Sequence, residues 1–514
     1  MMLIRSGIIV SFLTLLSRLL GLARELFIAA TFGSSSIADC VNVAFKFPNL
    51  FRRIFGEGAL SAVFIPIFNQ KLVKSRAAAK VFSGQVFVLL LLCLCIITIM
   101  MQIFMPYLMI IIAPGFYNHS TDKFNLAVLL CRITTPYLIF ISITALFGGM
   151  TNSVQRFAAF AFTPIIMNIC IIVGTILLQK ISTPHHGIAI SLIIAGILQV
   201  SFMFFCLLKA KLSFKLSFSL EDKSVRELIK NMGPATIGSG VGQLNLFISQ
   251  SIASFLPGAI SILSYADRLY QLPLALIGIT FGTVLLPELS KLYQKQQYRE
   301  ANFLQNKAIM IALCISTPAM FGLILLAKPI IHIVYERGAF NNYDTEKTAS
   351  ALVFFAFGLP AFILTKILTP IFYANLDTKT PLKITVYSVV INIILNIVLM
   401  IPFGHVGIAA GSSIAAWINF FLLNRNAKNY GNFAITWQTK TIILRSLFST
   451  IFMIIFIIFI NHYYDYIFYN SNLLLKIIAL LAIIFIAMVI FTLICYIQGI
   501  HKVLLKKYDT KISN

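Results

Sequence analysis

Charged residues crowd the first 60 positions of this chain, inside segments that are otherwise apolar enough to enter a membrane. They are Arg18, Arg24, Glu25, Asp39, Lys46, Arg52, Arg53 and Glu57. A cation at the centre of a bilayer costs at least about 2.5 kcal/mol, so such residues are expected to line an aqueous cavity or to face another helix. The set is more basic than acidic, which indicates an anionic ligand.

The first charged segment places its polar residues on two neighbouring stripes of a helix. Ser17 and Arg24 are seven residues apart, or two helical turns, and Arg18 and Glu25 repeat that spacing on the adjoining stripe. The planar fork of arginine binds phosphate oxygens through two hydrogen bonds and stays charged. The pattern therefore favours a phosphate or pyrophosphate group as ligand.

The second charged segment has a polar seam of its own. Asp39, Lys46 and Arg53 step by seven, whereas Arg52 points about 100° away from Arg53. Arg53 and Glu57 stand at i and i+4 and are placed to pair. A structural role, by snorkelling or salt bridging, is the alternative for the basic residues near an interface, namely Arg5, Lys46 and Arg53.

Two further polar groups come from the second half of the chain. Asp267 and Arg268 begin a later apolar segment, and Arg268 is the cation best placed to meet the first two segments across a cavity. Asn375, Asp377 and Thr380 offer oxygen atoms to a small cation. A helix-capping role for Asp377, ahead of a segment that starts near a proline, is the alternative.

The elements that position these residues are transmembrane helices. Of the 514 residues, 59% are hydrophobic and 11% charged, whereas soluble domains are about 45–50% apolar. Long apolar runs without strand alternation predict an all-α polytopic membrane protein with about fourteen transmembrane helices. The predicted spans are 8–32, 38–70, 82–112, 126–150, 157–179, 187–208, 228–256, 262–290, 306–334, 348–374, 382–401, 406–424, 442–461 and 473–497.

The formal net charge of +24 follows the topology and does not indicate nucleic-acid binding. Lysine and arginine cluster after even-numbered spans, as in 71–80, 209–230 and 291–299, and are scarce in the intervening loops. The positive-inside rule then places both termini in the cytoplasm. Contact with anionic membrane lipids accounts for much of the excess charge.

An internal repeat divides the chain into related halves. Residues 187–195 (GIAISLIIA) align with 407–415 (GIAAGSSIA), and 63–66 (VFIP) with 284–287 (VLLP). Six spans in each half predict two pseudo-symmetric lobes around a central cationic cavity, an architecture typical of alternating-access transporters. Channels and scaffolds also contain repeats. The predicted parts are an N-lobe (1–215), a cytoplasmic linker with the C-lobe (216–430), and a helix hairpin with a basic tail (431–514).

Signals for catalysis are missing. GxGxxG, Walker A, HExxH and GxSxG patterns are absent, so the sequence predicts no enzyme and no cofactor. The eight cysteines lie almost wholly in apolar stretches without CxxC spacing, which indicates packing thiols and no metal framework. Transport would then draw on a coupling ion, the membrane potential or the gradient of the cargo.

Several runs resemble one family of membrane transporters. The runs LSRLLGLARE at 16–25, AD at 38–39 and FKFPNLFRRIFGEGA at 45–59, with YADR at 265–268 and DTKTP at 377–381, resemble the MurJ (MviN) lipid II flippases of the MOP exporter superfamily. One departure is Glu25, where the family usually has Asp, and the longer side chain argues against direct cargo contact by this carboxylate.

The resemblance implies a fold, a cargo and a set of site residues. It implies V-shaped lobes that move undecaprenyl-pyrophosphate-linked disaccharide-pentapeptide (lipid II) from the cytoplasmic to the periplasmic leaflet of the bacterial inner membrane, for peptidoglycan synthesis. The working unit is expected to be a monomer, with spans 13 and 14 similar to the family's lipid-tail groove. The implied substrate-binding residues are Arg18, Arg24, Arg52, Arg268 and Asp39. The supporting residues are Ser17, Glu25, Lys46, Arg53, Glu57 and Asp267.

Other functions remain open at this stage. A polysaccharide-lipid flippase or a multidrug/cation antiporter of the same superfamily is the first alternative. A membrane scaffold that transports nothing is the second. The sign of the charge favours the phosphate-bearing cargo, because an exporter of organic cations needs acidic groups in its cavity.

Overall fold

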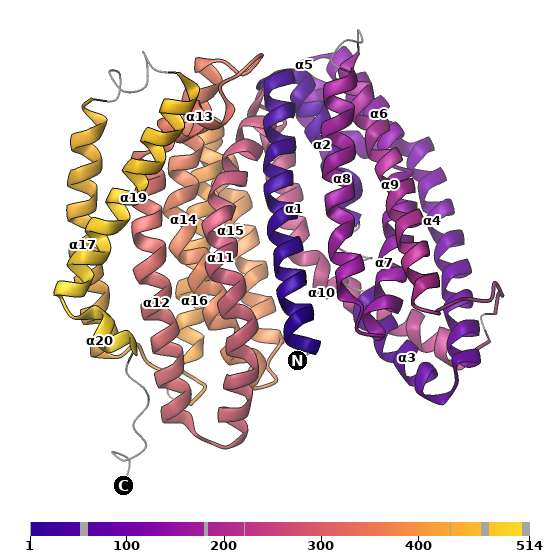
Figure 1. The fold of residues 1–514 in the computed structure, drawn as a ribbon. Coiled ribbons are helices and arrows are strands. Elements are labelled where there is room, and N and C mark those ends of the chain that lie inside the picture. Colours follow the sequence, from indigo (N-terminus) through magenta and orange to yellow (C-terminus); the bar gives the residue numbers. More distant parts are fainter. Residues whose placement is uncertain are drawn as a thin grey trace. The chain divides into compact units, whose positions relative to one another are not determined.

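The structure is a computed structural model that describes residues 2–51, 60–178, 183–219, 221–431, 433–463 and 472–505. Within these ranges every regular element is a helix and no strand occurs, which confirms the all-α class. Arg52, Arg53 and Glu57 fall outside the described residues. The chain divides into two compact units (Figure 1), described separately below. Unit 1 comprises Met1–Ser261 with Arg337–Phe340, and unit 2 comprises Ile262–Glu336 with Asn341–Asn514.

Unit 1 is a helical bundle that joins helices distant in sequence as well as consecutive ones. Its helices are α1 (Met2–Phe32), α2 (Ser36–Phe51), α3 (Ser61–Lys74), α4 (Arg76–Ile112), α5 (Pro114–His119), α6 (Thr121–Thr134), α7 (Tyr137–Ser153), α8 (Phe157–Leu178), α9 (Pro184–Lys209) and α10 (Lys223–Ala253). Helix α8 lies between α1 and α9, and α2 packs on α6. Helix α10 packs on α3, α4 and α5, so its contacts place it in unit 1.

Polar caps and turn residues explain where these helices begin and end. The side chains of Ser75, Ser120 and Asp222 accept backbone N–H groups in the first turns of α4, α6 and α10. Gly33, with φ of +58°, follows the last residue of α1. Each apolar run is thereby interrupted at the turn that returns the chain across the membrane.

Unit 2 repeats this construction and adds a hairpin. Its helices are α11 (Ala259–Gln294), whose first three residues count with unit 1, α12 (Tyr298–Leu325), α13 (Ala327–Tyr335), α14 (Asn342–Ala374), α15 (Lys379–Phe403), α16 (His405–Ala427), α17 (Trp437–Asn461), α19 (Leu473–Ile497) and α20 (Ile500–Leu505). Helices α17 and α19 pack on each other and on α12 and α13, as the predicted hairpin requires.

Each of the fourteen predicted spans coincides with one helix or with two consecutive helices of the described chain. Ten described helical stretches, one of which runs through α6 and α7, are long and apolar enough to cross a membrane. The other four predicted spans, which coincide with α1, with α2 and α3, with α10 and with α11, are the first two of each half. These are also the segments that carry most of the candidate site residues.

The internal repeat is visible in matching helix pairs. Contacts of α7 with α9 and of α8 with α9 in unit 1 correspond to contacts of α14 with α16 and of α15 with α16 in unit 2. Small residues allow the close approach: a Cβ on Gly174 would lie 1.8 Å from Ser191 Oγ, and one on Gly407 would lie 2.1 Å from the carbonyl oxygen of Leu399. The lobes are predicted from the sequence repeat, whereas the two units are defined by contacts between residues. The predicted lobe boundaries therefore stay a prediction.

Gly407→Ala is expected to destabilise unit 2, because its Cβ would overlap the backbone at Leu399. We expect a loss of about 1–3 kcal/mol, measured as a lower thermal unfolding midpoint in detergent. Gly322→Ala is the matched control, since nothing lies within 4 Å of its Cβ and alanine is the better helix former. Equal midpoints for the two variants would contradict the packing described for α15 and α16.

Candidate functional site

Arg24 lies at the centre of the charged cluster in unit 1. Its side chain comes from α1 and is only 4% exposed. One guanidinium nitrogen, Nη2, pairs with Glu25 Oε1 at 2.5 Å, and Nη1 donates to Asn168 Oδ1 of α8 at 3.1 Å. Asn168 Nδ2 in turn donates to the carbonyl oxygen of Ser17 at 3.1 Å. Asn168 therefore bridges the two positions, Ser17 and Arg24, that the sequence places on one face of the helix.

A third helix completes the surroundings of Arg24. The guanidinium carbon lies 4.2 Å from the centroid of the Phe45 ring on α2, a cation–π contact. Arg24 is thus held from α1, α2 and α8 together, which distinguishes it from an arginine that snorkels to an interface. Glu25 neutralises part of the charge on this guanidinium group.

The other predicted residues of this cluster are less enclosed. Ser17, Arg18 and Lys46 are half-buried, Ser17 and Arg18 on α1 and Lys46 on α2. Arg52, Arg53 and Glu57, which the prediction assigns to cargo binding and to a supporting pair, lie outside the described residues. The structure therefore brings Arg24, Glu25 and Ser17 together through Asn168, and it leaves the Arg53–Glu57 pair a prediction.

Asp39 has a different environment from the rest of the polar seam. Its side chain is fully buried, and Lys123 Nζ of α6 lies 2.9 Å from Oδ2. The backbone N–H of Gly258 donates to Oδ2 at 2.8 Å, and Ser261 donates to Oδ1 through its N–H at 3.0 Å and its hydroxyl at 2.8 Å. This carboxylate joins α2 to α6 and to the first turn of α11. The geometry supports a positioning role, and direct cargo contact by Asp39 stays a prediction.

Two glycine turns bring later parts of the chain onto the same end of unit 1. Gly258 has φ of +76°, and a Cβ there would lie 2.4 Å from the carbonyl oxygen of Ser34. Gly338 has φ of +59°, and the N–H of the next residue, Ala339, donates to the carbonyl oxygen of Ala30 at 2.8 Å. The ends of α1 and α2 are thus capped by segments that follow α10 and α13.

In unit 2, Arg268 lies on the more open face of α11. Tyr265, Ala266, Leu269 and Tyr270 are buried on the other face. The half-buried face carries polar side chains at i, i+3, i+4 and i+7, which are Ser264, Asp267, Arg268 and Gln271. Gln271 donates a hydrogen bond to Asp267. The amphipathic pattern therefore directs Asp267 and Arg268 away from the core of unit 2.

Asp377 has the geometry of a helix cap. Its Oδ1 accepts the N–H groups of Lys379 and Thr380, each at 3.0 Å, and its Oδ2 accepts the Tyr430 hydroxyl at 2.5 Å. Partial burial raises the pKa of this carboxyl, but hydrogen bonds from Thr380, Tyr430 and the backbone outweigh it and lower the pKa to about 2. Asn375 Nδ2 donates to the carbonyl oxygen of Ile371. These bonds support capping, and a cation site with Asn375, Asp377 and Thr380 stays a prediction.

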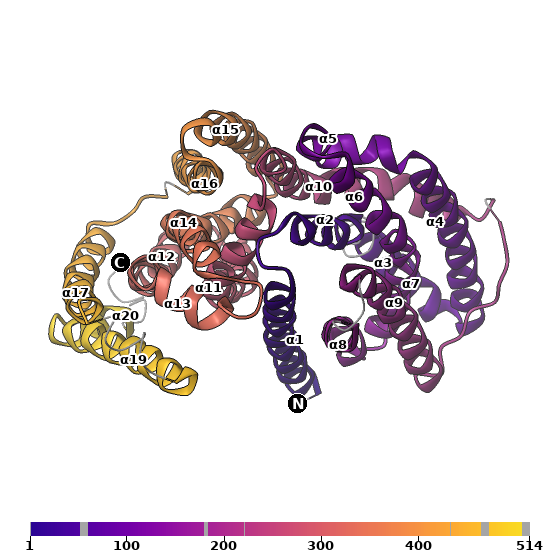
Figure 2. The ribbon, with the colours of Figure 1, turned by 90° about the horizontal axis from the view of Figure 1, so that it is seen from above.

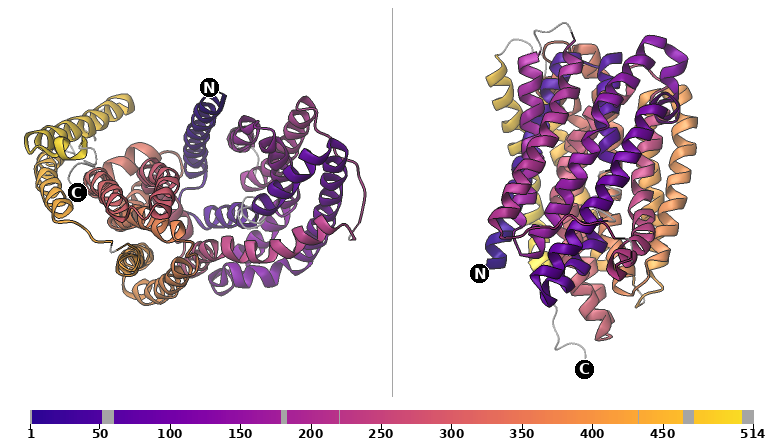
Figure 3. Two further views of the ribbon diagram at one scale, coloured as in Figure 1. Left: turned by 90° about the horizontal axis from the view of Figure 1, so that it is seen from below. Right: turned by 90° about the vertical axis from the view of Figure 1, so that its right-hand side faces the viewer.

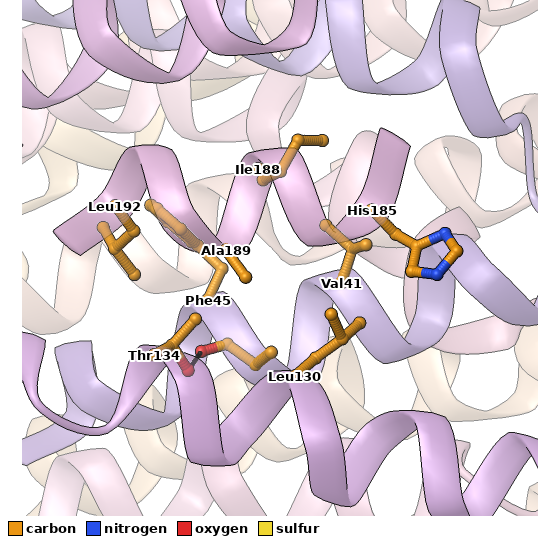
Figure 4. A pocket seen from close by; sticks show the side chains of 9 residues that line it. Val41, Phe45, Leu130, Thr134, His185, Ile188, Ala189 and Leu192 are labelled. Carbon is orange, nitrogen blue, oxygen red and sulfur yellow. Dashed lines mark hydrogen bonds between the residues drawn. The ribbon is translucent and has the colours of Figure 1, made fainter. Parts of the chain in front are cut away.

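A small, mostly apolar pocket adjoins this cluster within unit 1 (Figure 4). It encloses about 230 Å³, including space open to solvent, between α2, α6 and α9. Its lining includes Val41, Leu130, His185 and Phe45, whose ring also contacts Arg24. Thr134 donates its hydroxyl hydrogen to the carbonyl oxygen of Ala44 at 2.9 Å, which leaves the pocket lining largely apolar. The pocket lining therefore presents few polar groups to an anion.

Sequence reasoning missed Asn168, Phe45, Lys123 and Ser261 as site residues. Asn168 carried a usable signal, because it is a polar residue inside an apolar run and aligns with Asn392 in the repeat. Lys123 follows Asp122 at the start of a span and looks like an ordinary interfacial charge. Only the fold shows that its ammonium group meets Asp39.

Lys123→Met is expected to destabilise the protein by about 3–5 kcal/mol, because it leaves the Asp39 carboxylate buried without its cation. Adding Asp39→Asn should recover part of that loss, since no uncompensated charge remains. Thermal unfolding of the four chains of this double-mutant cycle measures the coupling. The exposed Lys328–Glu346 pair, at 3.3 Å, is the matched control and should couple by less than about 1 kcal/mol. Strictly additive losses of stability for the two single substitutions would contradict a direct interaction between Asp39 and Lys123.

Comparison with known proteins identifies relatives along nearly the whole chain. A family model described as "Lipid II flippase MurJ" matches residues 28–498. "Probable lipid II flippase MurJ" of Rickettsia prowazekii (strain Madrid E) is 55% identical over 491 residues, which cover 96% of this chain and 97% of that protein. The protein of the same name from Rhizobium tropici is 38% identical, over 97% of this chain and 95% of that protein.

Solved structures show the same fold. "Lipid II flippase MurJ, inward closed conformation" superposes with a TM-score of 0.80 at 30% identity, over 95% of this chain and 98% of that chain. An inward-facing multidrug resistance MATE transporter of the MOP superfamily has a TM-score of 0.68 at 14% identity, over 82% and 98%, which shows likeness of fold alone. Because the family model matches most of this chain and two relatives are well above 30% identical to it, the chain belongs to the lipid II flippase MurJ family.

Proposed function

We propose that this chain transfers lipid II from the cytoplasmic to the periplasmic leaflet of the bacterial inner membrane by alternating access, for peptidoglycan synthesis. Membership of the lipid II flippase MurJ family carries the proposal. The basic side chains in the helices that begin each half support it, because the pyrophosphate of lipid II is the anionic group that must cross the apolar layer.

Four arginines, Arg18, Arg24, Arg52 and Arg268, hold the pyrophosphate in this proposal. Arg24 has the firmest support, since contacts with Glu25, Asn168 and Phe45 orient its guanidinium before any cargo arrives. Ser17, Glu25, Lys46, Arg53, Glu57 and Asp267 are assigned supporting roles around them. Asp39 is assigned a positioning role through its contacts with Lys123 and the start of α11.

The remaining parts of the proposal concern topology and energy. Both termini face the cytoplasm, following the distribution of lysine and arginine. The protein acts as a monomer and changes no covalent bond of its cargo, so it is a transporter and not an enzyme. Transport draws on a coupling ion, the membrane potential or the gradient of the cargo, because no nucleotide-binding motif is present in the sequence.

Arg24→Ala or Arg52→Ala should abolish the rescue of cells depleted of their own lipid II flippase. Each substitution removes one of the four guanidinium groups that hold the pyrophosphate in this proposal. Arg299→Ala, an exposed arginine near the start of α12, is the matched control and should rescue normally. Immunoblots of membrane fractions check that all three variants insert to the same level.

Full rescue by both site variants would overturn the assignment of these arginines. A second measurement tests the cargo itself, by following lipid II accessibility at the outer face of cells in which this chain is the only candidate flippase. Uptake of a fluorescent organic cation into vesicles, driven by Na⁺ or H⁺, would instead support the antiporter alternative.

A further inference from the structure

The segment that links α9 to α10 does not hang free of unit 1. Residues 212–219, here called the linker segment, run as an extended chain along the outer side of α4 (Figures 2 and 3). The backbone N–H of Lys215 donates to the carbonyl oxygen of Lys80, in the second turn of α4, at 3.0 Å. A Cβ on Gly84 would lie 1.7 Å from the carbonyl oxygen of Lys215, so this glycine permits the close passage.

Apolar side chains of the linker segment fasten its first part to the bundle. Leu212 is buried in the core formed by α3, α4, α7 and α9. The Phe214 ring stacks on Phe87 of α4 at a centroid distance of 5.0 Å and on Phe147 of α7 at 5.6 Å. The linker segment is therefore fixed on the N-terminal part of α4 and on α7.

The second part of the linker segment has two exposed apolar side chains. Leu216 is 64% exposed and Phe218 is 59% exposed. Exposed lysines lie beside them, namely Lys80, Lys211 and Lys215. Across the part of the chain that the structure describes, none of these three lysines has an acidic partner within ion-pair distance. Two large apolar groups and three cations thus share one edge of unit 1.

Full exposure of the two large apolar side chains on this edge to water is unfavourable. Aligned apolar side chains at the end of a membrane-crossing helix enter the boundary between head groups and acyl chains, while lysine stems extend toward the head groups. Basic residues at the cytoplasmic surface attract anionic lipid, each contributing about fivefold in binding. Further cations that lie close by in the sequence add to the positive charge, namely Lys74, Arg76, Lys209 and Lys223, whereas Lys71 pairs with Asp222 at 3.8 Å.

We propose that the linker segment and the start of α4 form a binding site for an anionic phospholipid of the cytoplasmic leaflet. Lys80, Lys211 and Lys215 take the phosphate-bearing head group, and Leu216 and Phe218 lie among the upper acyl chains. An acidic protein is a weaker occupant, because the same edge exposes two large apolar side chains beside a lipid-facing helix. The site is separate from the cargo arginines and does not depend on the proposed function.

Tryptophan fluorescence in vesicles tests this site directly. Phe218→Trp is introduced into a chain whose two native tryptophans, Trp417 and Trp437, are replaced by Phe. The protein is reconstituted into equimolar phosphatidylcholine and phosphatidylglycerol, with bromine on the upper acyl chain of one lipid or the other. Brominated phosphatidylglycerol should quench the fluorescence of the introduced indole at least about twofold more than brominated phosphatidylcholine. A tryptophan placed by Ile103→Trp, at a 62% exposed position on α4, should show no head-group preference.

Two sets of variants separate charge from placement. Lys80→Gln, Lys211→Gln and Lys215→Gln together should remove the preference for phosphatidylglycerol, whereas Lys291→Gln, Lys295→Gln and Arg299→Gln in unit 2 should not. Gly84→Val should weaken quenching by both lipids, because its side chain pushes the linker segment off α4. Equal quenching by the two lipids in the parent chain would overturn the anionic site. No quenching by either would show that the edge is not in lipid and would favour a protein partner.

Discussion

The structure depends on one constraint, that a charge placed between membrane helices must find its counter-groups on those helices. Arg24 meets this constraint with Glu25 on its own helix, Asn168 on α8 and the Phe45 ring on α2. Each contact removes a part of the free energy that the buried guanidinium would otherwise cost. Because three helices must each supply a group, satisfying this one side chain also determines how α1, α2 and α8 pack.

Asp39 meets the same constraint in another way. Four protein donors saturate its carboxylate, and its side chain has no exposed surface. Burying such a group stabilises one arrangement of α2, α6 and the start of α11 by making others leave a charge unpaired. A saturated carboxylate fixes a position, whereas Arg18, Lys46 and Arg268 are half-buried and keep surface for a ligand. The four donors that saturate the Asp39 carboxylate therefore identify it as a positioning group, which its spacing in sequence does not.

The fold was largely predictable, and the partners of the charges were not. Apolar runs predict the membrane-spanning helices, because the thickness of the hydrocarbon layer sets the length of each run. The small residues of 187–195 and 407–415 predict the helix pairs that match between the two halves. Helical spacing correctly placed Ser17 and Arg24 on one face. It could not identify Asn168, 144 residues beyond Arg24, or Lys123, 84 residues beyond Asp39, because spacing specifies a face and not the helix opposite it.

The pairing of Arg24 with Glu25 has a consequence for any anionic cargo. In the proposed function, a site of arginines alone would carry unbalanced positive charge whenever no cargo is bound. A carboxylate next to Arg24 neutralises the guanidinium when no cargo is present and competes with the phosphate oxygens when cargo is bound. Glutamate in place of aspartate keeps this competition, since its longer side chain still reaches Nη2. In the proposed function, re-forming the Arg24–Glu25 pair on release of the cargo spares Arg24 the cost of being buried without an anion.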